Sequence, residues 1–180
     1  MVLFWYFAVY SFFGFLLEIG FAWVIHARKK DRKCFLLLPL CPVYGLGALA
    51  IMSLPQSVQD APLLLVLLGG LAATGAEYFM AVVYEKGLGV SFWDYSEIPG
   101  NWQGRVCPLF SLFWGLLAPI LVHRVHPMVV ELVREIPDVL SLWVAVLVAA
   151  DGVCTAVLLH RTRSTDSLRW YDMHEKPAAG

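Results

Sequence analysis

The feature that most constrains this chain is a series of five apolar runs, each close to twenty residues long. A helix of about 20 apolar residues crosses the ~30 Å hydrocarbon core of a bilayer. With 59% hydrophobic and 15% charged residues, the chain has the composition of a membrane protein. We therefore predict one all-α domain, a polytopic membrane bundle of five transmembrane helices, with spans at about 3–25, 35–54, 62–83, 105–122 and 139–159.

The distribution of positive charge predicts the orientation of the bundle. With five spans, 11 of the 13 Lys and Arg residues fall on one side, which holds the basic segment after the first span and the polar tail 161–180. Only Arg124 and Arg134 fall on the other side. Because cytoplasmic loops are enriched in Lys and Arg, we predict an outside N-terminus and an inside C-terminus, as in a multi-pass protein of the cytoplasmic (inner) membrane.

Several classes of function have no support in the sequence. A formal net charge of −1 gives no reason to expect a nucleic-acid partner. The phosphate-binding pattern Gly-x4-Gly-Lys-Ser/Thr is absent, so this chain does not bind ATP in that manner. The four cysteines form no CxxC pair and no Cys/His cluster, so we predict reduced thiols, no metal site and no cofactor.

Two hairpins of the chain show signs of an internal repeat. Cys41-Pro-Val-Tyr44 resembles Cys107-Pro-Leu-Phe110, which lies 66 residues later, and Glu18 precedes Glu77 by 59 residues. The first and second pairs of spans would then be two hairpins of the same orientation. Parallel repeats of this kind occur in transport folds, with the site at the repeat interface. The alternative is chance similarity in a chain rich in Leu, Pro and aromatic residues.

Three acidic residues occur at a similar depth in the predicted spans. Glu18, Glu77 and Asp151 lie seven, six and eight residues before the inner ends of spans 1, 3 and 5. At ~1.5 Å per residue, each is about 9–12 Å from the inner boundary. A carboxylate facing lipid is costly, so we expect all three to line one cavity that opens to the cytoplasm, with Arg105 as counter-charge for one of them. The alternative is that each carboxylate forms hydrogen bonds with backbone groups that lack a partner, or with a Tyr, Trp or Ser of a neighbouring helix.

The stretch 91–115 concentrates aromatic and polar residues between two apolar runs. We expect Asp94 to bond nearby backbone amides, and Trp93 and Tyr95 suit a membrane interface. In one interpretation the stretch is an ordered connector. In the other, Trp93 to Asn101 form a lid over the acidic cavity or a docking surface for a cytoplasmic partner.

Several motifs within residues 10–127 together resemble a known family: Phe12 to Glu18, Pro39 to Gly45, Glu77-Tyr78 with Glu85, Trp93-Asp-Tyr-Ser96, Asn101, Gly104-Arg105 and Trp114-Gly115. The chain is similar to the bacterial family of type IV, CmpB-like ABC-transporter permeases. The resemblance implies a transport role and adds Tyr44, Tyr78 and Trp114 to the candidate cavity residues. It ends before the fifth span, so it does not extend to Asp151.

Three functions fit these observations. The first is a permease subunit for a small solute, which would need a separate cytoplasmic ATPase and, having few spans, would form a homo-oligomer. In this interpretation, which we favour, the chain has no catalytic activity of its own. The second is a membrane-embedded enzyme acting on a lipid headgroup or amphiphile, with Glu77 or Asp94 as general base and Arg105 binding an anionic group. The third is an assembly or regulatory membrane subunit without a substrate.

Overall fold

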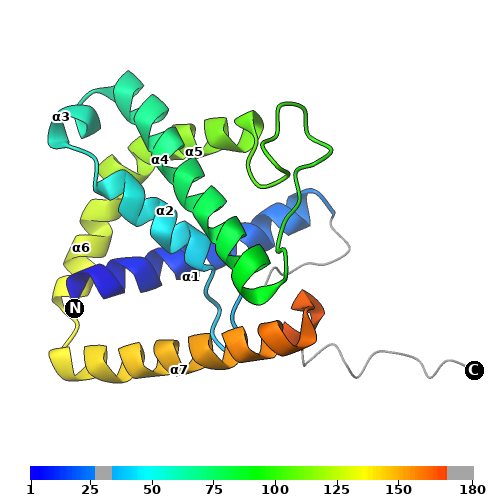
Figure 1. Ribbon diagram of the computed structural model, residues 1–180. Coiled ribbons are helices and arrows are strands. Elements are labelled where there is room, and N and C mark those ends of the chain that lie inside the picture. Colours follow the sequence, from blue (N-terminus) through cyan, green and yellow to red (C-terminus); the bar gives the residue numbers. More distant parts are fainter. Residues whose placement is uncertain (27–33, 170–180) are drawn as a thin grey trace, which may run out of the picture.

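The computed structural model describes residues 1–26 and 34–169, and its regular structure within those ranges is helical (Figure 1). The basic segment 27–33, which weighs heavily in the predicted orientation, lies outside the described residues. The α-helices are α1 (Val2–Val24), α2 (Pro42–Met52), α3 (Gln56–Gln59), α4 (Pro62–Val82), α5 (Pro108–Ile120), α6 (His126–Arg134) and α7 (Asp138–Thr162). Shorter turns of other helical types are η1 (Val83–Leu88), η2 (Leu121–Val125) and η3 (Thr165–Leu168).

The all-helical class predicted from the apolar runs is confirmed. Among the described residues, four helical segments are long and apolar enough to cross a membrane: Val2–Val24, Pro62–Leu88, Pro108–Arg134 and Asp138–Thr162. The sequence predicted five spans, and the difference lies in the second. There α2 has only 11 residues, which at ~1.5 Å per residue give about 17 Å of helix.

The second apolar run is half extended and half helical because of its prolines. Pro39 and Pro42 lack an N–H donor and disfavour helix in the residues before them. Pro42 therefore sits in the first turn of α2, and Cys41 before it is extended. The Cys41 amide donates to the carbonyl of Ser11, near the middle of α1, at 2.9 Å. Thus α2 begins about half-way along α1, and an extended segment leads up to it.

Helix α7 supplies the hydrogen-bond acceptors that this extended segment needs. Leu36 N–H donates to Thr155 Oγ1 at 2.9 Å, and Leu38 N–H donates to Asp151 Oδ2 at 2.7 Å. The Leu37 amide lies 3.0 Å from the same carboxylate. Within a bilayer, unwound backbone persists only where protein groups satisfy it. Asp151 and Thr155 are one helical turn apart and are both buried, so this face of α7 stabilises the break in the second run.

The helices pack in a chain of neighbours, with α1 against α2, α2 against α4 and α4 against α5 (Figure 1). Glycines allow the close approaches. A Cβ at Gly14 would overlap the Tyr44 ring, and a Cβ at Gly70 would lie 2.9 Å from the Ser111 carbonyl oxygen. Small residues at such crossings are typical of membrane helix pairs.

The two hairpins share a contact at related positions. In α1–α2, Ser11 meets Gly45, because a Cβ on Gly45 would overlap the Ser11 Oγ. In α4–α5, Gly70 meets Ser111. Ser11 and Gly70 are 59 residues apart, as are Glu18 and Glu77, and Gly45 and Ser111 are 66 apart, as are the two Cys-Pro motifs. The contact is therefore repeated with serine and glycine exchanged, which supports the two-hairpin repeat.

The last helix lies beside this group, along the lower edge of Figure 1. The indole Nε1 of Trp5 donates to Ser141 Oγ at 2.7 Å and joins the starts of α1 and α7. After α7, Leu168 is fully buried in a cluster with Leu159 and Tyr84. The tail was predicted to begin at residue 161, but residues up to Leu168 pack against the bundle, and 170–180 lie outside the described residues.

Helix α6 continues from α5 through η2 without a break, so that 108–134 form one helical segment. Pro119 lies inside α5, and the π-helical turn η2 follows it directly. Such turns and prolines are usual causes of helix bending, and the chain changes direction here in Figure 1. Tyr10 OH and His126 Nδ1, 2.8 Å apart, connect α6 to α1.

Candidate functional site

A cavity of about 360 Å³ lies between the two hairpins. Glu18 of α1 and Glu77 of α4 both line it. Its other lining residues are apolar or aromatic: Leu17, Phe21, Val43, Tyr44, Trp93, Tyr95, Phe110, Phe113, Trp114, Leu116, Leu117 and Ile120. The cavity is thus a mainly apolar space with two carboxylates.

Aromatic donors hold each carboxylate in place. Tyr44 OH donates to Glu18 Oε1 at 2.9 Å. Tyr95 OH donates to Glu77 Oε1 at 2.9 Å, and Trp114 Nε1 donates to Glu77 Oε2 at 3.1 Å. Glu77 is only 4% exposed, and burial of a carboxylate is tolerated where hydrogen bonds compensate for lost water. Bonds to Tyr and Trp on neighbouring segments were the alternative considered for these acids, and both interpretations hold: the carboxylates are bonded and line a cavity.

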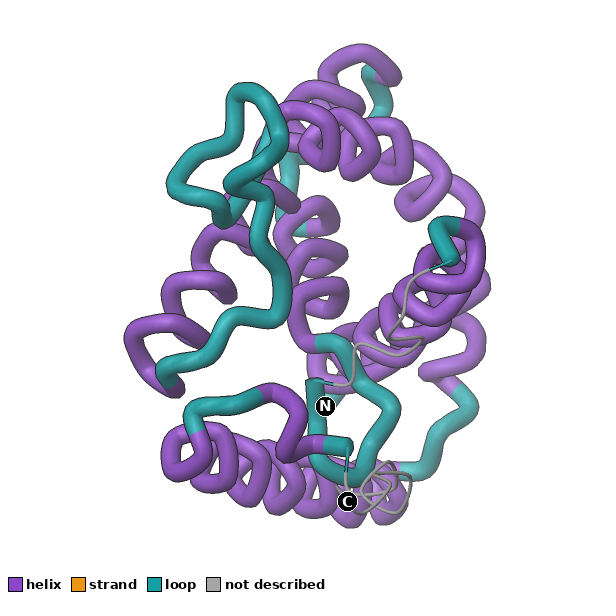
Figure 2. The backbone as a smooth tube through the Cα atoms, turned by 90° about the vertical axis from the view of Figure 1, so that its right-hand side faces the viewer, coloured by secondary structure: helices purple, strands orange, loops and turns teal. Residues whose placement is uncertain are grey.

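The loop from Gly89 to Cys107 lies over one end of the cavity, at the end of the bundle that faces the viewer in Figure 2. Two of its residues, Trp93 and Tyr95, belong to the cavity lining. Tyr95 also stacks on Phe110 of α5, with ring centroids 4.8 Å apart and planes at 18°. Trp93 and Tyr95 therefore form part of the cavity boundary on the side of the loop.

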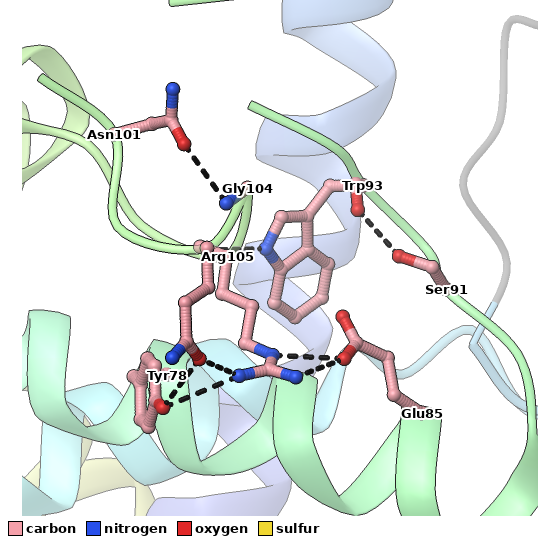
Figure 3. Close-up of polar contacts among 8 residues, drawn as sticks. Tyr78, Glu85, Ser91, Trp93, Asn101, Gly104 and Arg105 are labelled. Carbon is pink, nitrogen blue, oxygen red and sulfur yellow. Dashed lines mark hydrogen bonds and ion pairs between the residues drawn. The ribbon is translucent and has the colours of Figure 1, made fainter. Parts of the chain in front are cut away.

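Arg105 fastens the loop to α4 and η1 (Figure 3). Its Nε and Nη2 donate to one carboxylate oxygen of Glu85, at 2.8 and 2.6 Å. Its Nη1 donates to Tyr78 OH at 3.3 Å and to the side-chain carbonyl of Gln103. The Arg105 carbonyl in turn accepts from Trp93 Nε1 at 2.8 Å. The hydrogen bond to Glu85 raises the pKa of the guanidinium, so Arg105 keeps its positive charge at physiological pH.

A second set of polar contacts shapes the loop itself. The Asp94 carboxylate accepts from the Ser96 hydroxyl and amide, and these bonds lower the pKa of Asp94. The contribution of these hydrogen bonds to the stability of the turn is therefore fully present above the ordinary Asp pKa. It is lost only as the pH falls through the lowered pKa. Asn101 Oδ1 accepts from Gly104 N–H at 2.9 Å (Figure 3). Gly104 has φ +69, and a Cβ there would lie 2.7 Å from Asp94 Oδ1, so this position requires glycine.

Two expectations about charge are corrected by the structure. Asp151 does not line the cavity, because its carboxylate accepts from the Leu37 and Leu38 amides on another side of the bundle. Arg105 does not pair with Glu18, Glu77 or Asp151 in the described structure but with Glu85, which the sequence analysis left outside the candidate site.

The structure adds residues that had a signal in the sequence. Phe110 lines the cavity and occupies the position of Tyr44 in the predicted repeat, 66 residues later. Glu85 follows Glu77 by eight residues, about two helical turns, and was part of the family resemblance. Thr155 follows Asp151 by four residues, so it shares a helix face with a residue already singled out. Gln103 had no such signal.

Replacing Arg105 with lysine is expected to loosen the loop while leaving the helices in place. Lysine cannot reproduce the planar fork that reaches Glu85, Tyr78 and Gln103 together. Cleavage by chymotrypsin after Trp102, a side chain that is 66% exposed, should become several-fold faster in detergent-purified protein. Arg161→Lys, at an exposed position of α7, is the matched control and should cleave at the wild-type rate. Unchanged cleavage of Arg105→Lys would mean that the ion pair does not hold the loop.

Comparison with known proteins bears on this arrangement. No characterised protein and no solved structure matches the chain at a significant level. A family model does match, over residues 5–157, which include most of α1, all of α2 to α6, the loop, both carboxylates of the cavity and most of α7. The chain therefore belongs to the family described as "Putative ABC-transporter type IV" (ABC_trans_CmpB).

Proposed function

We propose that this protein is the membrane subunit of an ABC-type transporter and that the cavity between the hairpins is its solute site. The observation that carries the proposal is the convergence of Glu18 and Glu77, from equivalent helices of two hairpins, on one cavity. Transport folds built from repeats place their sites at the repeat interface. Family membership and the apolar helices support a membrane component of a transporter.

We propose further that the loop end of the bundle faces the cytoplasm. Among the described residues, Lys86, Arg105 and Arg161 lie at or near this end, whereas Arg124 and Arg134 belong to η2 and α6. Cytoplasmic segments are enriched in such residues. Trp93 and Tyr95 then separate the cavity from the cytoplasm, and the loop controls access to it.

The same loop offers a surface for a separate ATPase subunit. A second hollow, of about 480 Å³, lies on it and is lined by polar residues that include Glu85, Asp94 and Gln103. Trp93 lines both this hollow and the cavity. A partner bound in the hollow would therefore contact a side chain that also bounds the solute site, which is a direct route for coupling.

Purification of the native complex in mild detergent tests the proposed assembly. An ATPase subunit present in stoichiometric amount, identified by mass spectrometry, is the expected result. Arg105→Lys, which loosens the loop, should reduce the amount of co-purified ATPase, and Arg161→Lys should not. A pure complex of this chain with lipid alone, or with no ATP-hydrolysing protein, would contradict the proposal and leave a role as enzyme or assembly subunit.

Glu77→Gln is expected to reduce ATP-dependent solute accumulation at least tenfold while leaving the protein in the membrane. The amide keeps the size of the side chain and can still accept a hydrogen bond, but it removes the charge. Membrane vesicles containing the complex would be incubated with a small-molecule extract of the source cells, with and without ATP. The solutes accumulated in the vesicles would then be compared by mass spectrometry. Glu131→Gln, at an exposed position of α6, is the control and should behave as wild type. Equal accumulation by Glu77→Gln would rule out the cavity as the transport path.

A further inference from the structure

We propose that the ligand of this cavity is a hydrophobic organic cation, such as a quaternary ammonium group carried by an apolar body. The inference rests on the proposed function and names its substrate class. It is drawn from three properties of the cavity: its charge, its aromatic rings and the side on which it opens.

The charge of the cavity favours a cation. Both oxygens of Glu77 accept bonds from uncharged donors, the Tyr95 hydroxyl and the Trp114 indole. Glu18 lines the same space. The lining that the structure describes contains no lysine, arginine or histidine. An ionised carboxylate in a mainly apolar space creates a strong negative potential because little solvent screens it. A cation complements this potential, and an anion would be repelled.

The aromatic rings favour a cation that is weakly hydrated. Seven aromatic side chains line the cavity, those of Phe21, Tyr44, Trp93, Tyr95, Phe110, Phe113 and Trp114. The polar ends of Tyr95 and Trp114 are turned to Glu77, and that of Tyr44 to Glu18. What these side chains can offer to a ligand is their π surface. Ring faces attract organic cations, and they do so most strongly where the contact is desolvated.

The opening of the cavity favours an apolar body on the cation. Leu17 and Phe21 of α1 and Leu116 and Ile120 of α5 belong to the cavity lining. Leu17, Leu116 and Ile120 are each 53% exposed, although they belong to helices that are apolar enough to span a membrane. In a bilayer these side chains face lipid. The cavity therefore opens sideways toward the hydrocarbon, where an apolar part of the ligand is favoured.

A metal ion fits the same cavity poorly. Among the described residues, no group of three or more His, Cys, Asp or Glu side chains is placed to hold one. Hard cations need several oxygen ligands at short distance, and only two carboxylates line this space.

Calorimetric titration of the purified, detergent-solubilised complex tests the inference. The probe is benzyltrimethylammonium, and its counterpart is phenylmethanesulfonate, which has the same benzyl group and a tetrahedral head of opposite charge. We expect saturable binding of the ammonium ion only. Glu77→Gln should weaken this binding at least tenfold, and Glu131→Gln should leave it unchanged. Because Glu77→Gln also loses hydrogen-bonding partners, Phe113→Leu serves as a second variant, and it should weaken binding several-fold without affecting the fold.

Other results would overturn the inference. Equal binding of both ions, no saturable binding of the ammonium ion, or full affinity in both Glu77→Gln and Phe113→Leu would each exclude a cation-selective cavity. The outcome is separable from that of the transport experiment. Binding that depends on Glu77 in a protein that accumulates no solute would keep the ligand class and reject transport. Accumulation of a neutral or anionic solute that depends on Glu77, without ammonium binding, would keep transport and reject the ligand class.

Discussion

Asp151→Ala is expected to lower the free energy of unfolding by about 2–6 kcal/mol, from about 1–3 kcal/mol for each of two N–H groups that lose their acceptor where water does not replace it. Those groups are the amides of Leu37 and Leu38, in the extended part of the second apolar run. Water cannot replace the carboxylate at this depth, because Asp151 is only 5% exposed. Asp151→Asn keeps one acceptor oxygen, so its effect should be smaller.

Unfolding in mixed micelles with increasing SDS would measure these effects. Val153→Ala is the matched control on the same helix, because Val153 is 64% exposed and makes no such bond. It should change stability far less. If Asp151→Ala unfolded at the same SDS fraction as Val153→Ala, the extended segment would not depend on α7, and Asp151 would again be a candidate for a role in solute binding.

Gly14→Ala is expected to destabilise the protein by about 1–3 kcal/mol or more, the range for inserting a methyl group into a packed core. The new Cβ would overlap the Tyr44 ring close to its attachment, where the side chain cannot swing aside. Helices α1 and α2 would have to separate. Because Tyr44 OH donates to Glu18, the substitution should also disturb the cavity and weaken ligand binding.

Gly20→Ala provides the control within the same helix. A Cβ at Gly20 meets nothing within 4 Å. Alanine is the better helix former by up to about 1 kcal/mol, so this variant should be as stable as wild type or slightly more stable. Thermal unfolding in detergent, followed by tryptophan fluorescence, would distinguish the two variants. A similar loss of stability in both would mean that α1 and α2 are not packed at Gly14 as described.

The structure brings together the two carboxylates for which two independent sequence signals agreed. Glu18 and Glu77 had similar depths and similar positions in a repeat. Asp151 had only the depth. Depth along a helix says nothing about the direction in which a side chain points, and Asp151 points to the extended segment rather than to the cavity. The depth of a residue along its helix is therefore insufficient, by itself, to place that residue in a site.

Pro39 and Pro42 indicate a break in the second apolar run. The prediction of a transmembrane span there counted every residue of the run as helical, although some of them are extended. Extended backbone covers about twice the distance per residue of a helix, so 11 helical residues and the segment before them differ in length from a continuous span. The ion-pair partner of Arg105 could not be predicted from the sequence either. It depends on how the loop folds back, which is set by contacts such as that of Trp93 Nε1 with the Arg105 carbonyl.

Because the extended segment depends on α7, it cannot reach its final structure until α7 has been synthesised. The Leu37 amide and its acceptor are separated by 114 residues of chain. At about 5–20 residues per second, a ribosome needs about 6–23 s to make that stretch. During this interval the second apolar run has left the ribosome, but the hydrogen-bond acceptors that stabilise its extended backbone in lipid have not yet been made. The translocon or a membrane chaperone must therefore shelter it until the last helix arrives, and nascent chains that stop before residue 151 should remain bound to that machinery.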